Sequence, residues 1–246
     1  RYMKNFKSAI MIAVNVASKN LSKKFMSEQE VVNNLSNMIM LTGVINRGIK
    51  LTGTVNTDWT LQNYGYPYFV TASITVNAGA KFTIAQNDTI NLTGAYSITA
   101  GTATTSLGSI VADKVIFKGF TTSTTDQLAF KFGSGGKVTN CSFAGFDVTC
   151  ANASNPEIKN NSFDNAFISL TESSPIIQNN TFDNVTYPVL FIDECSPVLS
   201  NLNMLSGVTN RGIRLTGTVN TDWTLQNYGY PYFITASITV NTGATF

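Results

Sequence analysis

Two aspartates could place a pair of carboxylates side by side. Asp164 and Asp183 each follow a phenylalanine directly, in the similar words NNSFDNAF and NNTFDNV. If those words lie in register on adjacent coils, the carboxylates are about one strand spacing apart. Charges that close either raise the pKa of one carboxyl group or hold Ca²⁺ between oxygen ligands. The alternative, which the sequence favours, is that both are solvated turn residues.

The residue types in the chain limit which other catalytic or metal-binding chemistry is possible. The chain contains no histidine, which excludes a histidine-based triad, an imidazole base and histidine metal ligands. Carboxylate, lysine and arginine chemistry remain available. Cys141, Cys150 and Cys195 form no CxxC motif, and their odd number leaves at least one thiol without an intrachain partner. We expect all three to be buried as small apolar side chains.

A second set of residues could bind a ligand. Tyr64, Tyr66 and Tyr68 are separated by single residues, so they would share one face of an extended strand. A flat aromatic strip can stack on sugar rings or pack against another protein. The favoured alternative is that these rings cover the core where one group of coils meets the next. The candidate residues are Trp59, Tyr64, Tyr66 and Tyr68, with their copies Trp223, Tyr228, Tyr230 and Tyr232.

Those copies belong to a long internal repeat. Residues 52–69 recur without change at 216–233, and the alignment extends without a gap over 35–82 and 199–246, with eight differences. We refer to these two stretches as the duplicated segment, in its first and second occurrence. The spacing predicts a tandem array. Its predicted divisions are an N-terminal segment at 1–34, one repeat unit at 35–198, and the start of a second, near-identical unit at 199–246.

A shorter period runs inside the unit. Phe143, Phe163 and Phe182 recur at intervals of about 20 residues, in short runs bounded by Asn, Gly, Ser and Pro. This pattern predicts stacked coils, each a few short strands joined by turns. The phenylalanines would form an internal aromatic stack. A matching asparagine series would form a ladder at a bend, because asparagine tolerates the left-handed conformation: Asn140, Asn160, Asn179 and Asn201.

Composition narrows the class of protein. Only 12% of residues are charged and the net charge is +2, with six of the basic residues in 1–34. The remainder is near neutral and lacks the basic footprint of a nucleic-acid binder. A surface rich in Thr, Ser, Asn and Gly favours a secreted all-β protein, which places it outside the cell or on its surface.

Residues 1–34 break the coil pattern. Ile10, Val14 and Leu21 fall on one face of a predicted amphipathic helix, which would cap the open end of the coil stack. The alternative is a signal peptide that begins at Met3, with a basic start and an apolar middle. The segment is too short and too polar to span a membrane.

The run WTLQNYGYPYFVTASITVNAGAKFTIAQNDTINL resembles the segment with which secreted bacterial right-handed parallel β-helix proteins begin their solenoid. The NNSF and NNTF words are similar to coils of the pectin-lyase-like superfold. That superfold includes polysaccharide lyases and hydrolases, but also adhesins and surface-array proteins. The resemblance implies that a lyase would use carboxylate-bound Ca²⁺ and a Lys or Arg base. Lys159, the nearest such residue, lies across the predicted asparagine bend.

The sequence therefore predicts an all-β fold, a right-handed parallel β-helix with an N-terminal capping helix. The predicted function is a repetitive extracellular structural or adhesive module, without enzymatic activity or cofactor, whose copies assemble head to tail into filaments. The alternative is a carbohydrate-binding or polysaccharide-degrading domain, such as a Ca²⁺-dependent lyase, with cell-surface glycans as its partners. Asp164 and Asp183 would then be the metal ligands.

Overall fold

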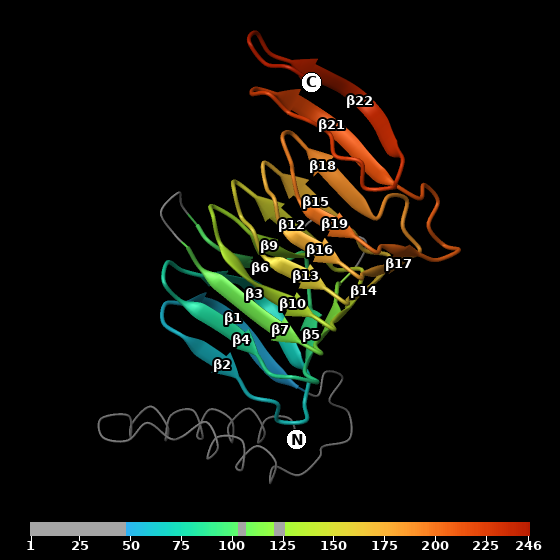
Figure 1. Cartoon of the computed structure of the whole chain (residues 1–246). Helices are drawn as coiled ribbons and strands as arrows, with labels where there is room; N and C mark the ends of the chain where they lie inside the picture. The colour runs from blue at the N-terminus through green and yellow to red at the C-terminus, as the bar shows by residue number, and fades with distance from the viewer. Residues whose placement is uncertain (1–47, 103–106, 121–125) are drawn as a thin grey trace, which may run out of the picture. The chain divides into compact units, whose positions relative to one another are not determined.

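Short parallel strands stack into a solenoid along the described chain. The computed structural model describes residues 48–102, 107–120 and 126–246 (Figure 1). The strands lie in three columns, and each full coil contributes one strand to each column. The first column is a seven-stranded sheet: β2 (Trp59–Leu61), β4 (Lys81–Ile84), β7 (Ser109–Asp113), β10 (Gly135–Thr139), β13 (Glu157–Lys159), β16 (Ile176–Gln178) and β19 (Val198–Ser200).

The other two columns form a single 15-stranded sheet. The second column contains β5 (Thr89–Leu92), β8 (Ile116–Lys118), β11 (Ser142–Ala144), β14 (Ser162–Asp164), β17 (Thr181–Asp183) and β20 (Asn203–Met204). The third contains β6 (Ser97–Ala100), β9 (Gln127–Phe130), β12 (Asp147–Ala151), β15 (Ile168–Thr171), β18 (Val189–Ile192), β21 (Ile213–Val219) and β22 (Tyr232–Val240). The long strand β3 (Tyr68–Val76) pairs with both β5 and β6 and so joins the columns, while β1 (Ile49–Val55) pairs with β3 on its other side.

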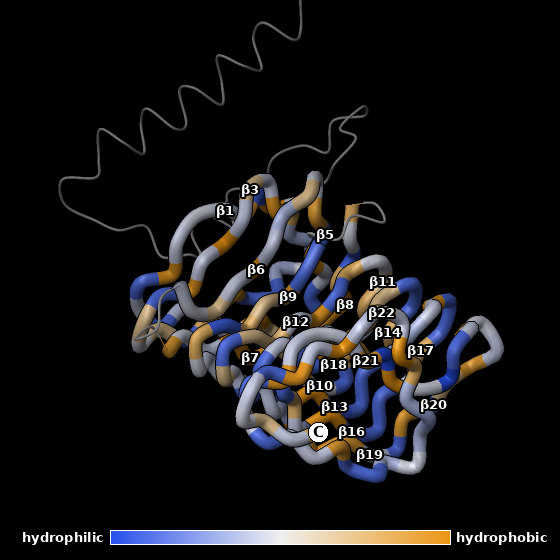
Figure 2. The backbone as a smooth tube through the Cα atoms, turned by 90° about the horizontal axis from the view of Figure 1, so that it is seen from above, coloured by the Kyte–Doolittle hydropathy of each residue, from blue (hydrophilic) through white to orange (hydrophobic). Residues whose placement is uncertain are grey.

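Alternation of side chains along each strand creates the core. Inward residues are apolar and buried, and outward residues are polar, so hydropathy alternates along the tube in Figure 2. In the second column, successive rings of Phe117, Phe143, Phe163 and Phe182 lie 4.8, 4.8 and 4.9 Å apart and nearly parallel. The three phenylalanines expected to stack therefore lie in one column, which Phe117 extends by one rung.

The chain turns sharply between the first and second columns. Asn140, Asn160, Asn179 and Asn201 occupy these corners with φ of 56, 58, 56 and 54°. A left-handed residue at each corner lets one strand follow another without a loop, and asparagine adopts this conformation at low cost. The amide of Asn201 donates to Oδ1 of Asn179 at 3.0 Å, which links two neighbouring corners.

The two long strands of the duplicated segment pair in the same way in both occurrences. β1 pairs with β3 from Ile49↔Tyr68 to Val55↔Val76, with a register shift after Leu51. β21 pairs with β22 at the corresponding positions of the second occurrence, with the equivalent shift after Leu215. The second occurrence also continues the solenoid, because β21 pairs with β18.

The predicted capping helix at 1–34 lies outside the described residues. The part of the chain that the structure describes contains strands and turns and no helix. Accordingly, no helix long and apolar enough to cross a membrane is found among those residues.

Candidate functional site

A groove of about 400 Å³ runs along the outer surface where the second column turns into the third. Its wall is built by three equivalent turns, in which Gly145, Asn165 and Asn184 have φ of 59, 50 and 51°. These left-handed residues bend the backbone outward at the same place in successive coils. The groove is therefore a product of the repeat, and its remaining side chains come from the start of β12, the residue before β15, the turn before β18, β18 itself and β21.

A buried carboxyl group lies at one end of this groove. Asp147, at the start of β12, is 8% exposed, and its Oδ1 accepts a hydrogen bond from the Phe167 N–H at 3.0 Å. Burial raises the pKa of Asp147 to about 6, because an ionised carboxylate loses hydration there, and the nearby Asp126 carboxylate acts in the same direction. The groove thus offers a carboxyl group that changes charge near neutral pH.

An arginine and an aromatic ring form the other end. The Arg214 guanidinium carbon lies 5.9 Å from the centre of the Tyr187 ring, within the range of a cation–π contact. Nε of Arg214 donates to Oγ1 of Thr235 at 2.7 Å, which fixes the direction of the side chain. The Tyr187 ring also packs edge-on against Phe233, with centroids 5.7 Å apart. A fixed cation beside a ring can recognise an acidic, partly apolar ligand.

The raised pKa of Asp147 makes stability depend on pH. Because the folded state binds its proton more tightly than the unfolded state, the free energy of unfolding should fall as pH rises from about 4 to 6 and then level off. Asp88, whose pKa burial also raises to about 6, contributes with the same sign. Asp147→Asn keeps the bond from Phe167 and should increase stability at pH 7 by about 1–3 kcal/mol. Denaturant titrations of both proteins between pH 4 and 8 measure this, and an unchanged slope in the variant would contradict it.

The two aspartates proposed as a carboxylate pair are indeed neighbours. Asp164 and Asp183 are Cα partners in the pairing of β14 with β17. Amide groups already bind them: Asn184 Nδ2 donates to Asp164 at 2.7 Å, and the backbone N–H groups of Asn184 and Gly207 both donate to Asp183 Oδ1 at 3.0 Å. Among the described residues there is no group of three or more Asp, Glu, His or Cys side chains placed to share a metal ion. Ca²⁺ binding here stays a prediction.

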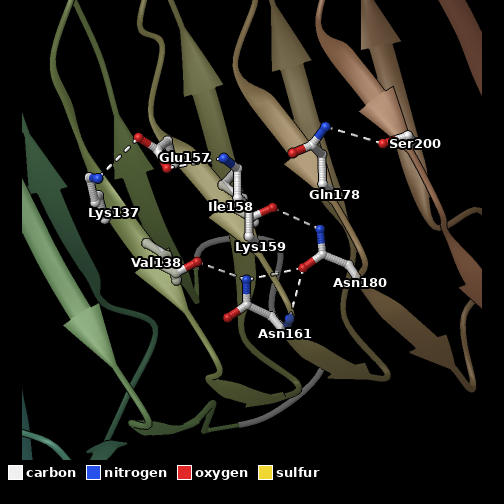
Figure 3. Close-up of polar contacts among 9 residues, drawn as sticks. All are labelled: Lys137, Val138, Glu157, Ile158, Lys159, Asn161, Gln178, Asn180 and Ser200. Atoms are coloured by element: carbon white, nitrogen blue, oxygen red, sulfur yellow. Dashed lines mark hydrogen bonds and ion pairs between the residues drawn. The ribbon is translucent and has the colours of Figure 1, made fainter.

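Lys159, the residue considered as a base for that pair, has another partner. It lies in β13 of the first column, where its Nζ is 3.2 Å from Glu157, and Lys137 contacts the same carboxylate at 3.2 Å (Figure 3). Both lysines lower the pKa of Glu157, and Lys159 has the larger effect. Lys159 is thus held on the outer face of a different sheet from Asp164 and Asp183.

Comparison with known proteins agrees with this geometry. A family model described as "right handed beta helix region" matches residues 72–227, more than half of the chain. The chain belongs to the right-handed β-helix family. The same comparisons found no match among curated proteins or solved structures. The role of the groove in this β-helix therefore has to be inferred from the residues that line it.

The tyrosine residues considered as a flat strip do not form one in this β-helix. Tyr68 lies in the core and Tyr64 packs against it, which agrees with the favoured alternative that these rings cover the core. Tyr68 is buried, Tyr64 is half-buried, and Tyr66 is 40% exposed. The reason is Gly65, whose φ of 75° bends the chain before β3, and whose N–H donates to Asn63 Oδ1 at 2.8 Å. An extended run with period two does not form, and the three rings therefore differ in exposure.

The second set of aromatic residues connects coils of the β-helix. Trp223 Nε1 donates to the Cys195 carbonyl at 2.9 Å, and the Tyr228 hydroxyl donates to the Pro197 carbonyl at 2.8 Å. The Tyr230 hydroxyl accepts from the Leu202 N–H at 2.7 Å. The three backbone partners, which are Cys195, Pro197 and Leu202, all belong to the preceding coil. In the first occurrence, Trp59 packs on Phe82 at 5.4 Å, and Tyr68 donates to the Gln62 carbonyl at 2.7 Å; Tyr232 donates equivalently to Gln226 at 2.8 Å.

A buried asparagine ladder supports the β-helix one position after the predicted series. Asn161 Oδ1 accepts from the Cys141 N–H at 2.8 Å. Its Nδ2 donates to the Val138 carbonyl at 2.9 Å and to Asn180 Oδ1 at 3.1 Å (Figure 3). Asn180 Nδ2 in turn donates to the Ile158 carbonyl at 2.9 Å. Each amide satisfies backbone groups of the coil before it, which the corner cannot pair internally.

The three cysteines are free thiols, and all are buried. Burial is the main cause that raises the pKa of Cys141 and of Cys195 to about 11, and it also raises the pKa of Cys150. Such thiols are poor nucleophiles, because the reactive thiolate is scarce at neutral pH.

Proposed function

We propose that this β-helix is a repetitive structural or adhesive module that acts outside the cell and extends block by block along the solenoid axis. The observation that carries the proposal is the duplicated segment. Its second occurrence stacks on β18 with the pairing Val189↔Ile213, and its first occurrence supports β5 and β6. The second occurrence thus pairs with a strand that precedes it in the chain, and the first occurrence pairs with strands that follow it. Such a segment can connect two blocks in an array.

Copies of the chain are the partners that this function requires. Contact between unlike ends of identical chains is heterologous and gives filaments when it does not close into a ring. Purified protein should form rods whose length increases with concentration, visible by negative-stain electron microscopy and measurable by sedimentation velocity. Particles that stay monomeric from micromolar to millimolar concentration would count against this function.

Carbohydrate binding is the second candidate, and the groove is the observation that favours it. Its aromatic ring, guanidinium and amides match the hydroxyl, carboxylate and ring-face chemistry of an acidic sugar chain. We expect Tyr187→Ala to weaken binding of acidic oligosaccharides at least tenfold in calorimetric titrations. Tyr66→Ala, which removes a partly exposed ring elsewhere, should leave the affinity unchanged. Equal affinities in both variants would remove the groove as the binding site.

An enzymatic version of this candidate would act on the same sugars. Release of unsaturated products from acidic polysaccharides, measured by ultraviolet absorbance with and without Ca²⁺, separates a lyase from a binding module. The expected result for a structural or adhesive module is no release under either condition.

A further inference from the structure

The groove carries its charged side chains at its two ends. Among the residues that line it, these are Asp147 and Arg214. Three strand spacings separate them, because β12, β15, β18 and β21 pair in succession along the third column (Figure 1). β12 and β21 therefore lie about 14 Å apart along the solenoid axis. A ligand that contacts both ends is an extended chain, because a single sugar ring is too short.

The lining between these two ends is uncharged. Phe167, Val185 and Leu190 are half-buried and offer apolar contacts, while Asn165 and Thr186 are exposed and offer an amide and a hydroxyl group. A surface that mixes apolar area with a few polar groups suits the faces and the hydroxyl edges of sugar rings. The nearest carboxylates outside the lining, Asp164 and Asp183, already accept hydrogen bonds from Asn184 and Gly207.

Asp147 lies among neighbours that mostly carry no charge. On the adjacent strands these are Gln127 and Phe167, neither of which titrates. The other titratable side chain of β12 is Cys150, a buried thiol whose pKa is raised. Burial is the main cause that raises the pKa of Asp147 to about 6, and the Asp126 carboxylate before β9 acts in the same direction. A second negative charge at this place is therefore costly.

We propose that the groove binds a linear acidic oligosaccharide along the solenoid axis, with Arg214 and Tyr187 on one acidic unit and Asp147 on the other end only while Asp147 is neutral. Since the Phe167 N–H already binds Oδ1, the proton of Asp147 belongs on Oδ2, from which it can be donated to a sugar oxygen. An ionised Asp147 would repel the carboxylates of the ligand and would lose hydration without a compensating partner. This inference rests on carbohydrate binding, the second candidate function, and adds the ligand class and its control by protons.

Calorimetric titrations at several pH values test the proton control. The probes are two acidic hexasaccharides, one of galacturonic acid and one of mannuronic acid, whose carboxylates stay ionised between pH 5 and 8. We expect at least one to bind, with an affinity that falls about tenfold per pH unit above pH 6, because binding then requires uptake of one proton at Asp147. Ionic strength is held constant, so that screening does not change with pH.

Variants assign this pH dependence to one side chain. Asp147→Asn, which is neutral at every pH, should keep the affinity of the unmodified protein at pH 5 and bind about 100-fold more tightly than that protein at pH 8. Asp88→Asn is the matched control. Asp88 is equally buried, its pKa is also raised to about 6 by burial, and it lies outside the groove, so its variant should retain the original pH profile.

The opposite end of the groove should respond differently. Arg214→Gln removes a cation that stays charged throughout this pH range, and should weaken binding at least tenfold at every pH without changing the slope. Hexaglutamate, which carries a similar charge without sugar rings, should bind at least tenfold more weakly than the hexasaccharide.

The outcomes separate this inference from the function on which it rests. If neither hexasaccharide binds at pH 5, carbohydrate binding and its control by protons are both overturned. An affinity that is constant from pH 5 to 8, or a slope that Asp147→Asn retains or Asp88→Asn removes, overturns the proton control and leaves carbohydrate binding standing. Equal affinity for hexaglutamate overturns the sugar ligand in favour of an acidic peptide. A slope that only Asp147→Asn abolishes supports the inference.

Discussion

Replacing Phe163 by alanine is expected to lower the free energy of unfolding by about 3–5 kcal/mol. The ring is 1% exposed and lies between Phe143 and Phe182, at 4.8 and 4.9 Å. Its removal leaves a cavity in the middle of the aromatic column. The neighbouring rings cannot fill this cavity, because strand pairing fixes their positions along the solenoid axis. Guanidinium unfolding followed by circular dichroism measures the change.

An exposed phenylalanine provides the comparison for this result. Phe120 is 56% exposed, and Phe120→Ala should change the free energy of unfolding by less than about 0.5 kcal/mol. If both variants lost the same stability, the aromatic column would not be the main source of packing energy between these coils.

The second large effect is expected for Asn161→Ala, with a loss of about 2–4 kcal/mol. The substitution leaves the Cys141 N–H and the Val138 carbonyl without the side-chain partner that each has at 2.8 and 2.9 Å. Both groups lie at a buried corner, where each unsatisfied polar group costs the free energy of its lost hydration. The effect should appear in the same unfolding experiment.

The adjacent residue gives a strict control for the ladder. Asn160 is exposed and left-handed, with φ of 58°, and Asn160→Gly keeps that backbone conformation while removing the side chain. We expect a change below about 0.5 kcal/mol. A loss as large as that of Asn161→Ala would mean that the corner depends on the outer asparagine.

The fold is predictable because its main determinant is periodic. Phe143, Phe163 and Phe182 recur at the coil period, and the period alone places them in one column. Phe146, which packs at 5.2 Å on Phe117, has no counterpart at that spacing. The period thus identifies the column and misses the ring that fills the space beside it.

The corner asparagines show that residue type alone does not predict which side chain is buried. In the two Asn-Asn pairs of the described coils, at 160–161 and 179–180, the first residue takes the left-handed corner and the second is buried. The two residues are chemically identical, so composition cannot assign these roles. The corner series follows from spacing, whereas the buried series requires knowledge of which backbone groups lie beneath it.

The groove is not predictable from the sequence because its parts are distant along the chain. Asp147, Tyr187 and Arg214 come from three different coils, and only the stacking brings them together. A signal is present in Asn165 and Asn184, which both occur two positions after a stacked phenylalanine. The tyrosine strip fails for the opposite reason, since Gly65 breaks a local pattern that looks regular.

The orientation of the strand hydrogen bonds has a mechanical consequence. These bonds run along the solenoid axis, and each coil is bonded only to the coils directly above and below it. Tension applied to the two ends of the solenoid acts on all of these interfaces in series, and the chain yields by peeling one coil after another. A solenoid built this way dissipates a pull in many small steps and retains the rest of its stack throughout.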